Sequence, residues 1–165
     1  MTHMNSSSGN RNRSTPRISL TGVITALLLM LSQAAIAATS CTIDSVASVN
    51  FGTYDVFSSF TNNNGVGSIT IRCQGGGSSF IVSLSSGQSN SFVSRIMRSG
   101  GNALNYNLYT SAARIVVWGD GTGGSGTMSV SKNSTTTLSV YGQIPAGQNV
   151  AVGVYSDNIT TIINF

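Results

Sequence analysis

The segment Val66-Gly67-Ser68-Ile69-Thr70-Ile71-Arg72-Cys73 alternates apolar and polar side chains and runs into three glycines at 75–77. A period of two followed by a glycine cluster predicts a half-buried β-strand that ends in a turn. Comparable runs occur at 46–51, 80–85, 103–110, 115–118, 127–131, 135–141, 149–155 and 159–165. Clusters of Gly, Asn, Ser and Pro lie between these runs, as expected of turns. The pattern predicts an all-β fold, an antiparallel Ig-like β-sandwich.

The N-terminal part of the chain has the order of a secretory signal peptide. A basic stretch at 11–17 precedes an apolar segment of 14 residues at 18–31, and a small-x-small site follows at 35–37. The apolar segment is shorter than the roughly 18 residues expected of a membrane span. We therefore expect 1–37 to be a cleaved signal peptide and 38–165 to be one exported domain with no membrane span.

Cleavage would change the charge of the protein. The full chain has eight cationic side chains, four anionic side chains and one histidine, but three of the cations and the histidine precede residue 38. The exported part keeps five cations and four anions, a net charge of +1. Five scattered cations cannot neutralise a run of phosphates, so no nucleic-acid partner is expected.

The exported part offers few residues for catalysis. Without histidine it has no Ser-His-Asp or Cys-His arrangement and no histidine metal site. The four acidic residues are expected to be turn or surface aspartates: Asp44, Asp55, Asp120 and Asp157. The glycine-rich segment at 120–124 lacks the lysine of a phosphate loop and predicts a hairpin turn. We expect no enzymatic activity, cofactor or metal.

Cys41 and Cys73 are the two cysteines of the chain. Export to an oxidising compartment favours a structural disulfide between them. Closing a loop of about 33 residues would add on the order of 3 to 4 kcal/mol of stability by the chain-entropy estimate.

The last run of the chain also alternates. Ile159, Thr161, Ile163 and Phe165 fall on one face of this predicted strand. An Ig-like sandwich normally has a further strand that covers such an edge. From the pattern alone two interpretations stay open: a sandwich that lacks one strand, and a complete sandwich with an ordinary edge.

A set of motifs in the exported part resembles the spore coat protein U domain family. The segments that carry the resemblance are VNFGTYD at 49–55, ITIRC at 69–73, LNYNLY at 104–109, WGDGTG at 118–123, YGQIPAGQ at 141–148 and GVYSD at 153–157. Their order along the chain is more specific than any single motif. Members of this family include spore-coat proteins and subunits of archaic chaperone-usher pili.

The resemblance implies an incomplete, pilin-like Ig fold with a Cys41–Cys73 disulfide. It also implies three kinds of partner: a periplasmic chaperone that lends a strand, an outer-membrane usher, and neighbouring pilus subunits. Residues 159–165 would form one wall of a strand-acceptor groove, lined by Ile159, Thr161, Ile163 and Phe165. The protein would pass through the periplasm and be secreted or reach the cell surface as part of a pilus or coat.

The sequence departs from the pilin pattern ahead of the first cysteine. Cleavage after residue 37 leaves Ala38, Thr39 and Ser40 before Cys41, whereas filling a groove takes about five or more residues. This favours a structural subunit at a tip or terminal position, which accepts a strand but has little to donate.

The alternative is a self-contained secreted module that adheres to a surface or binds a glycan. Phe57 and Phe60 are the candidate contact residues in a predicted loop, although we expect them to pack over the end of the sandwich. Trp118 is expected in the core, because a strand tryptophan of an Ig-like domain usually lies there.

Overall fold

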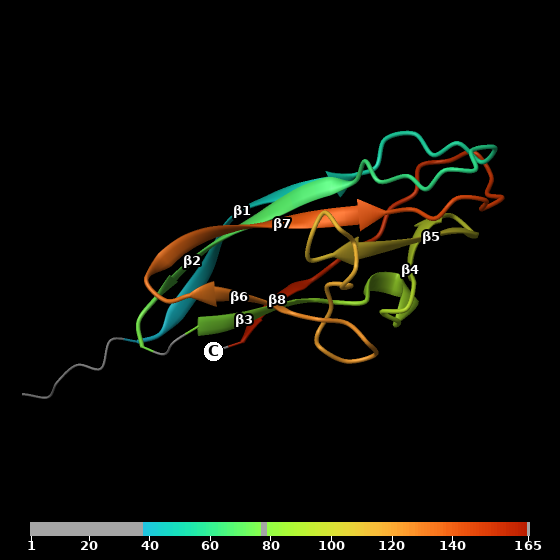
Figure 1. The fold of residues 1–165 in the computed structure, drawn as a ribbon. Helices are drawn as coiled ribbons and strands as arrows, with labels where there is room; N and C mark the ends of the chain where they lie inside the picture. The colour runs from blue at the N-terminus through green and yellow to red at the C-terminus, as the bar shows by residue number, and fades with distance from the viewer. Residues whose placement is uncertain (1–37, 77–78, 165) are drawn as a thin grey trace, which may run out of the picture. The chain divides into compact units, whose positions relative to one another are not determined.

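The computed structural model describes residues 38–76 and 79–164, which fold into two antiparallel sheets (Figure 1). The larger sheet has the strand order β1-β2-β7-β5-β4, and the smaller sheet has the order β6-β3-β8. The strands are β1 (Ser40–Asn50), β2 (Val66–Gln74), β3 (Ser79–Leu84), β4 (Arg95–Ser99), β5 (Asn102–Tyr109), β6 (Met128–Ser131), β7 (Ser134–Gln143) and β8 (Thr161–Asn164). One 3-10 turn, η1 (Gly87–Ser89), follows β3. The predicted all-β, antiparallel fold is confirmed.

Seven of the nine predicted runs overlap strands of the structure. The run at 115–118 is wrong as a strand, because it makes isolated bridges through Val117 and Trp118 instead. The run at 149–155 forms no strand either. Strand β4 was missed because Arg95 occupies a core-facing position, where the alternating pattern requires an apolar side chain.

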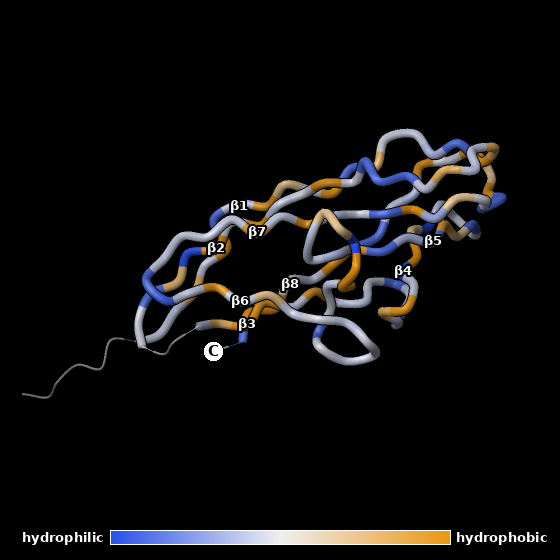
Figure 2. The backbone as a smooth tube through the Cα atoms, viewed as in Figure 1, coloured by the Kyte–Doolittle hydropathy of each residue, from blue (hydrophilic) through white to orange (hydrophobic). Residues whose placement is uncertain are grey.

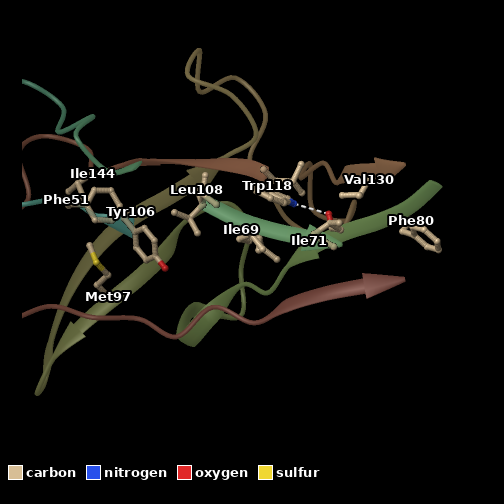
Figure 3. Packing of buried hydrophobic residues seen from close by; sticks show 14 of the residues in the cluster. Phe51, Ile69, Ile71, Phe80, Met97, Tyr106, Leu108, Trp118, Val130 and Ile144 are labelled. Atoms are coloured by element: carbon tan, nitrogen blue, oxygen red, sulfur yellow. Dashed lines mark hydrogen bonds between the residues drawn. The ribbon is translucent and has the colours of Figure 1, made fainter. Parts of the chain in front are cut away.

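The core consists of the inward-facing apolar side chains of both sheets, and hydrophobic residues recur along the strands in Figure 2. Figure 3 shows Trp118 near Ile71 and Val130, and Phe51 near Tyr106 farther along the same core. The indole N–H of Trp118 donates a hydrogen bond of 3.0 Å to the carbonyl of a β3 residue, drawn as a dashed line in Figure 3. Trp118 is fully buried, which confirms the predicted core position.

Candidate functional site

Strand β1 is an edge strand whose core-facing side is uncovered. It pairs with β2 alone, and the register sets Ile43 opposite Ile71 and Val46 opposite Ile69. Residues directly opposite each other point to the same side of a sheet, so Ile43 and Val46 face the core. Ile69 and Ile71 are 4% and 0% exposed, whereas Ile43 is 42% and Val46 is 61% exposed. No strand among the described residues covers these two side chains.

Strand β8 is the corresponding edge of the smaller sheet and pairs with β3 alone. Thr161 lies opposite Leu84 and Ile163 lies opposite Val82, and both β3 residues are buried. Thr161 and Ile163 therefore face the core as well, yet both are half-buried. Ile159 ahead of the strand is also half-buried and packs against the core.

Of the four residues predicted to line an acceptor groove, Thr161 and Ile163 thus face the core from β8, and Ile159 packs against the core just ahead of it. Their neighbours Thr160 and Ile162 are more exposed, so the alternation expected from the sequence is present. Phe165 lies outside the described residues. The role of these residues in accepting a strand stays a prediction.

The two edges belong to one continuous arrangement of paired strands. Tyr109 of β5 pairs with Val117, and Trp118 pairs with Gly126 just ahead of β6. The N–H of Trp118 donates to the carbonyl of Leu108 (2.8 Å), and the N–H of Gly126 donates to the carbonyl of Val117 (2.8 Å). The order therefore runs β1-β2-β7-β5, across this segment, to β6-β3-β8. β1 and β8 are the two ends of this order, and β4, the other edge strand of the larger sheet, pairs with β5 beside this segment.

We call the core-facing residues of these two edges the open side; they are Ile43, Val46, Ile159, Thr161 and Ile163. The open side combines exposed apolar surface with strand edges that pair on one side only. Such edges are templates for pairing with another strand. The ligand shape that matches such edges is an extended chain segment.

The Cys41–Cys73 disulfide fastens β1 to its neighbour. The two residues are register partners of β1 and β2, with their Cα atoms 4.1 Å apart. The predicted bridge is confirmed. On the outer face, Arg72 and Asp44 form an ion pair of 2.7 Å that is largely exposed to solvent. An exposed pair contributes about 0 to 1 kcal/mol, so the disulfide is the stronger restraint on β1.

A polar cluster surrounds Arg95, which the sequence pattern does not distinguish from the other four cations of the exported part. Arg95 is 0% exposed. Its guanidinium donates to Oδ1 of Asn107 (2.7 Å) and to the carbonyls of Ser85 (2.8 Å) and Trp118 (2.7 Å). The guanidinium carbon of Arg95 also lies over the ring of Phe92, 5.3 Å from the ring centroid. Burial lowers the pKa of Arg95 from its usual value, but an arginine stays charged at neutral pH.

Asp157 is also more than the turn or surface aspartate that was expected. Its Oδ2 accepts a hydrogen bond of 2.7 Å from the hydroxyl of Tyr106, which is 4% exposed. Its Oδ1 accepts from the backbone N–H of Gln88 (3.1 Å) and of Asn158 (2.8 Å). Burial first, and the bond to Asp157 second, raise the pKa of Tyr106, so the phenol remains a proton donor at physiological pH.

The other predicted turn aspartates have that role. Oδ1 of Asp55 accepts from the N–H of Phe57 (2.9 Å), and Oδ1 of Asp120 accepts from the N–H of Thr122 (2.8 Å). The bonds from Thr122 lower the pKa of Asp120. The expectation for Phe57 and Phe60 is wrong, because their side chains are 93% and 82% exposed.

Two features of the described residues bear on other classes of function. No helix within 38–76 or 79–164 reaches the length and hydropathy of a membrane span. In the same residues, no group of three or more His, Cys, Asp or Glu side chains gathers where it could hold a metal ion.

Comparison with known proteins gives a family match and several similar proteins, two of which are described below. Residues 25–161 match the Spore Coat Protein U domain. Protein U of Myxococcus xanthus is 32% identical over 141 residues, which cover 76% of this chain and 78% of the relative.

A solved structure is similar at lower identity. It is the CsuC-CsuE chaperone-tip adhesion subunit pre-assembly complex from archaic chaperone-usher Csu pili of Acinetobacter baumannii, with 23% identity and a TM-score of 0.49. The match covers 78% of this chain and 40% of the matched chain, so this chain spans less than half of that chain's length. From the domain match and the identity with Protein U, the chain belongs to the Spore Coat Protein U domain family.

Proposed function

We propose that the protein is a structural subunit of a bacterial pilus or coat and that it completes its fold by accepting a strand from another chain. The observation that carries this proposal is the exposure of Ile43 and Val46, at 42% and 61%, beside cross-strand partners that are buried. A side chain that faces the core and still meets solvent marks a missing neighbour. Membership of a family of coat proteins supports a structural rather than an enzymatic role.

An inserted strand would both pair with the free strand edges and cover the exposed apolar side chains of the open side. Its backbone would pair with β1 on one side and β8 on the other, and alternate side chains would cover the apolar residues. Fully burying a Val or Ile side chain contributes about 1.5 to 3 kcal/mol. Val46, Ile43 and Ile163 are already partly buried, so covering them contributes about 2 to 4 kcal/mol, a large fraction of the stability of a small domain.

The uncovered edges call for a strand from a second chain, and the resemblance to pilus subunits implies which chains would supply it. A periplasmic chaperone would lend a strand during export, an outer-membrane usher would exchange it, and a neighbouring subunit would supply the final strand at the cell surface. If the signal peptide is cleaved after residue 37, Ser40 and Cys41 already pair with Gln74 and Cys73 of β2. Such a subunit would accept a strand but donate none, which suits a tip or terminal position.

A synthetic peptide of alternating valine and threonine tests strand acceptance by the processed, oxidised protein. At a concentration about 100-fold above its Kd, a ligand specific for the folded state adds about 2.7 kcal/mol. For a domain of this size we expect the melting temperature to rise by on the order of 10 °C. A peptide of the same composition with its valines in one block should have a much smaller effect.

Matched variants locate the binding site. Val46→Ser on the open side should weaken peptide binding. Val66→Ser makes the same change on β2, where Val66 is 54% exposed, and should leave binding unchanged. A monomer that melts sharply and is indifferent to both peptides would instead mean a closed sandwich and would reject strand acceptance.

A second candidate function is a self-contained adhesive module. It is favoured by Phe57 and Phe60, whose rings meet solvent although large apolar side chains are usually buried. Local bonds hold this loop with its rings outward: Oγ of Ser58 accepts from the N–H of Phe60 (3.1 Å), as Asp55 does from that of Phe57. Exposed apolar groups of this kind contact other surfaces.

The adhesive function predicts that the double variant Phe57→Ser/Phe60→Ser loses most of its retention on a phenyl-coated surface. Full burial of one phenyl ring against a surface contributes about 1.5 to 3 kcal/mol. Losing both rings is therefore expected to lower the retention at least about tenfold. Ser59→Ala in the same loop is the matched control. Equal retention of the two variants on the phenyl surface would exclude adhesion through these rings.

A further inference from the structure

The chain between β7 and β8 must be positioned by contacts other than a strand ladder. Residues 145–160 contain no strand, and their backbone pairing is confined to a bridge between Ser156 and Arg98 of β4, together with contacts near Thr160. Strand β8 then pairs with β3 over four residues. A strand this short at an edge depends on whatever fixes the residues directly ahead of it.

The first such contact is the bond from the Tyr106 hydroxyl to Asp157. Tyr106 is held rigidly, because it is buried on β5 and its ring packs edge-on against Phe51, with centroids 5.8 Å apart. The carboxylate of Asp157 sits against Gly87, where φ is +64° and a Cβ atom would collide with it. The carboxylate therefore occupies a fitted place between β5 and η1.

The second contact starts at the buried Arg95. Its guanidinium holds the carbonyl of Ser85, the residue that follows β3. Ser85 in turn holds Thr160: the N–H of Ser85 donates to the carbonyl of Thr160 (2.9 Å), and the N–H of Thr160 donates to Oγ of Ser85 (2.9 Å). The buried Tyr106 holds the chain at Asp157, and the buried Arg95, through Ser85, holds it at Thr160. Both points lie directly ahead of β8.

We propose that Tyr106 and Asp157 are a positioning pair that sets the register of β8 and so keeps the open side ready to accept a strand. The second half of this proposal rests on the proposed function. A slip of one residue would turn Thr161 and Ile163 away from the core, because successive side chains of a strand point to opposite faces. Neither residue belongs to the open side, so the pair would act on a donor strand through the position of β8.

Two conservative variants test the pair. Tyr106→Phe removes one oxygen and keeps the ring, and Asp157→Asn keeps the shape of the side chain. In each variant, amide hydrogen exchange in the β3–β8 ladder should become at least about tenfold faster. The β1–β2 ladder should exchange at its original rate, because only β8 opens locally. Affinity for the alternating peptide should fall by about tenfold, with little change in global unfolding.

The controls separate this pair from a general loss of stability. Asp120→Asn alters an exposed turn aspartate and should change neither exchange nor affinity. The double variant should lose less than the sum of the two single variants, because both changes weaken the same contact. If every ladder exchanges faster together, or if β8 exchanges at its original rate, the positioning role is overturned.

The two proposals can fail separately. If the unaltered protein ignores the peptide while the variants still loosen β8 selectively, strand acceptance is wrong but the positioning role stands. If the unaltered protein binds the peptide and both variants bind it equally well with unchanged exchange, the positioning role is wrong and strand acceptance stands.

Discussion

Replacing Arg95 by methionine is expected to destabilise the domain by about 2 to 6 kcal/mol, because the buried polar groups that its guanidinium bonds lose their donor. The carbonyls of Ser85 and Trp118 would each lose a buried donor. An unsatisfied buried polar group costs about 1 to 3 kcal/mol. Asn107 would also lose a partner, although its Oδ1 still accepts from the N–H of Leu108.

Urea unfolding measures this loss against Arg98→Met, a matched change on the same strand. Arg98 is exposed on the outer face of β4, so its replacement should cost less than about 1 kcal/mol. Arg95→Lys should also be strongly destabilising, because one ammonium group cannot reproduce the planar, forked donor set of a guanidinium. Equal stabilities of Arg95→Met and Arg98→Met would mean that the buried cluster contributes little.

The same residue shows why the sequence predicted part of the fold and not the rest. Strands such as β2 and β7 were predictable because one face is buried and apolar while the other is polar. In β4 the buried positions hold Arg95 and Met97, so the polar face and the core face look alike in sequence. The partners that make a buried arginine tolerable come from three distant segments, and no local pattern reports them.

The candidate site was likewise half predictable. Ile159, Thr161 and Ile163 keep a period of two, and this alternation is enough to predict that they share one face of a strand. On β1 the register shifts between Ile43 and Ser45, so the core-facing apolar residues are three positions apart at Ile43 and Val46. A β-bulge inserts one residue and breaks the period, which is why the second edge of the open side was not found.

Removing the disulfide is the second change with a large expected effect. In the double variant Cys41→Ser/Cys73→Ser, the denatured chain regains the freedom of a loop of about 33 residues, which lowers the free energy of unfolding by about 3 to 4 kcal/mol. Cys73 is 1% exposed, so a serine hydroxyl there adds a desolvation cost. Cys41→Ala/Cys73→Ala avoids that cost and isolates the cross-link.

The disulfide also bears on strand acceptance, because β1 is an edge strand with an uncovered core face. With the bridge cut, one side of β1 is held by its pairing with β2 and by the exposed Asp44–Arg72 pair. We expect amide exchange along β1 to rise more than exchange along β3 and β8, and the alternating peptide to restore part of the lost stability by pairing with the free edge. If the reduced protein keeps its unfolding free energy to within about 1 kcal/mol and β1 exchanges no faster, then strand pairing alone holds this edge, and the bridge has no part in preparing the open side for its donor.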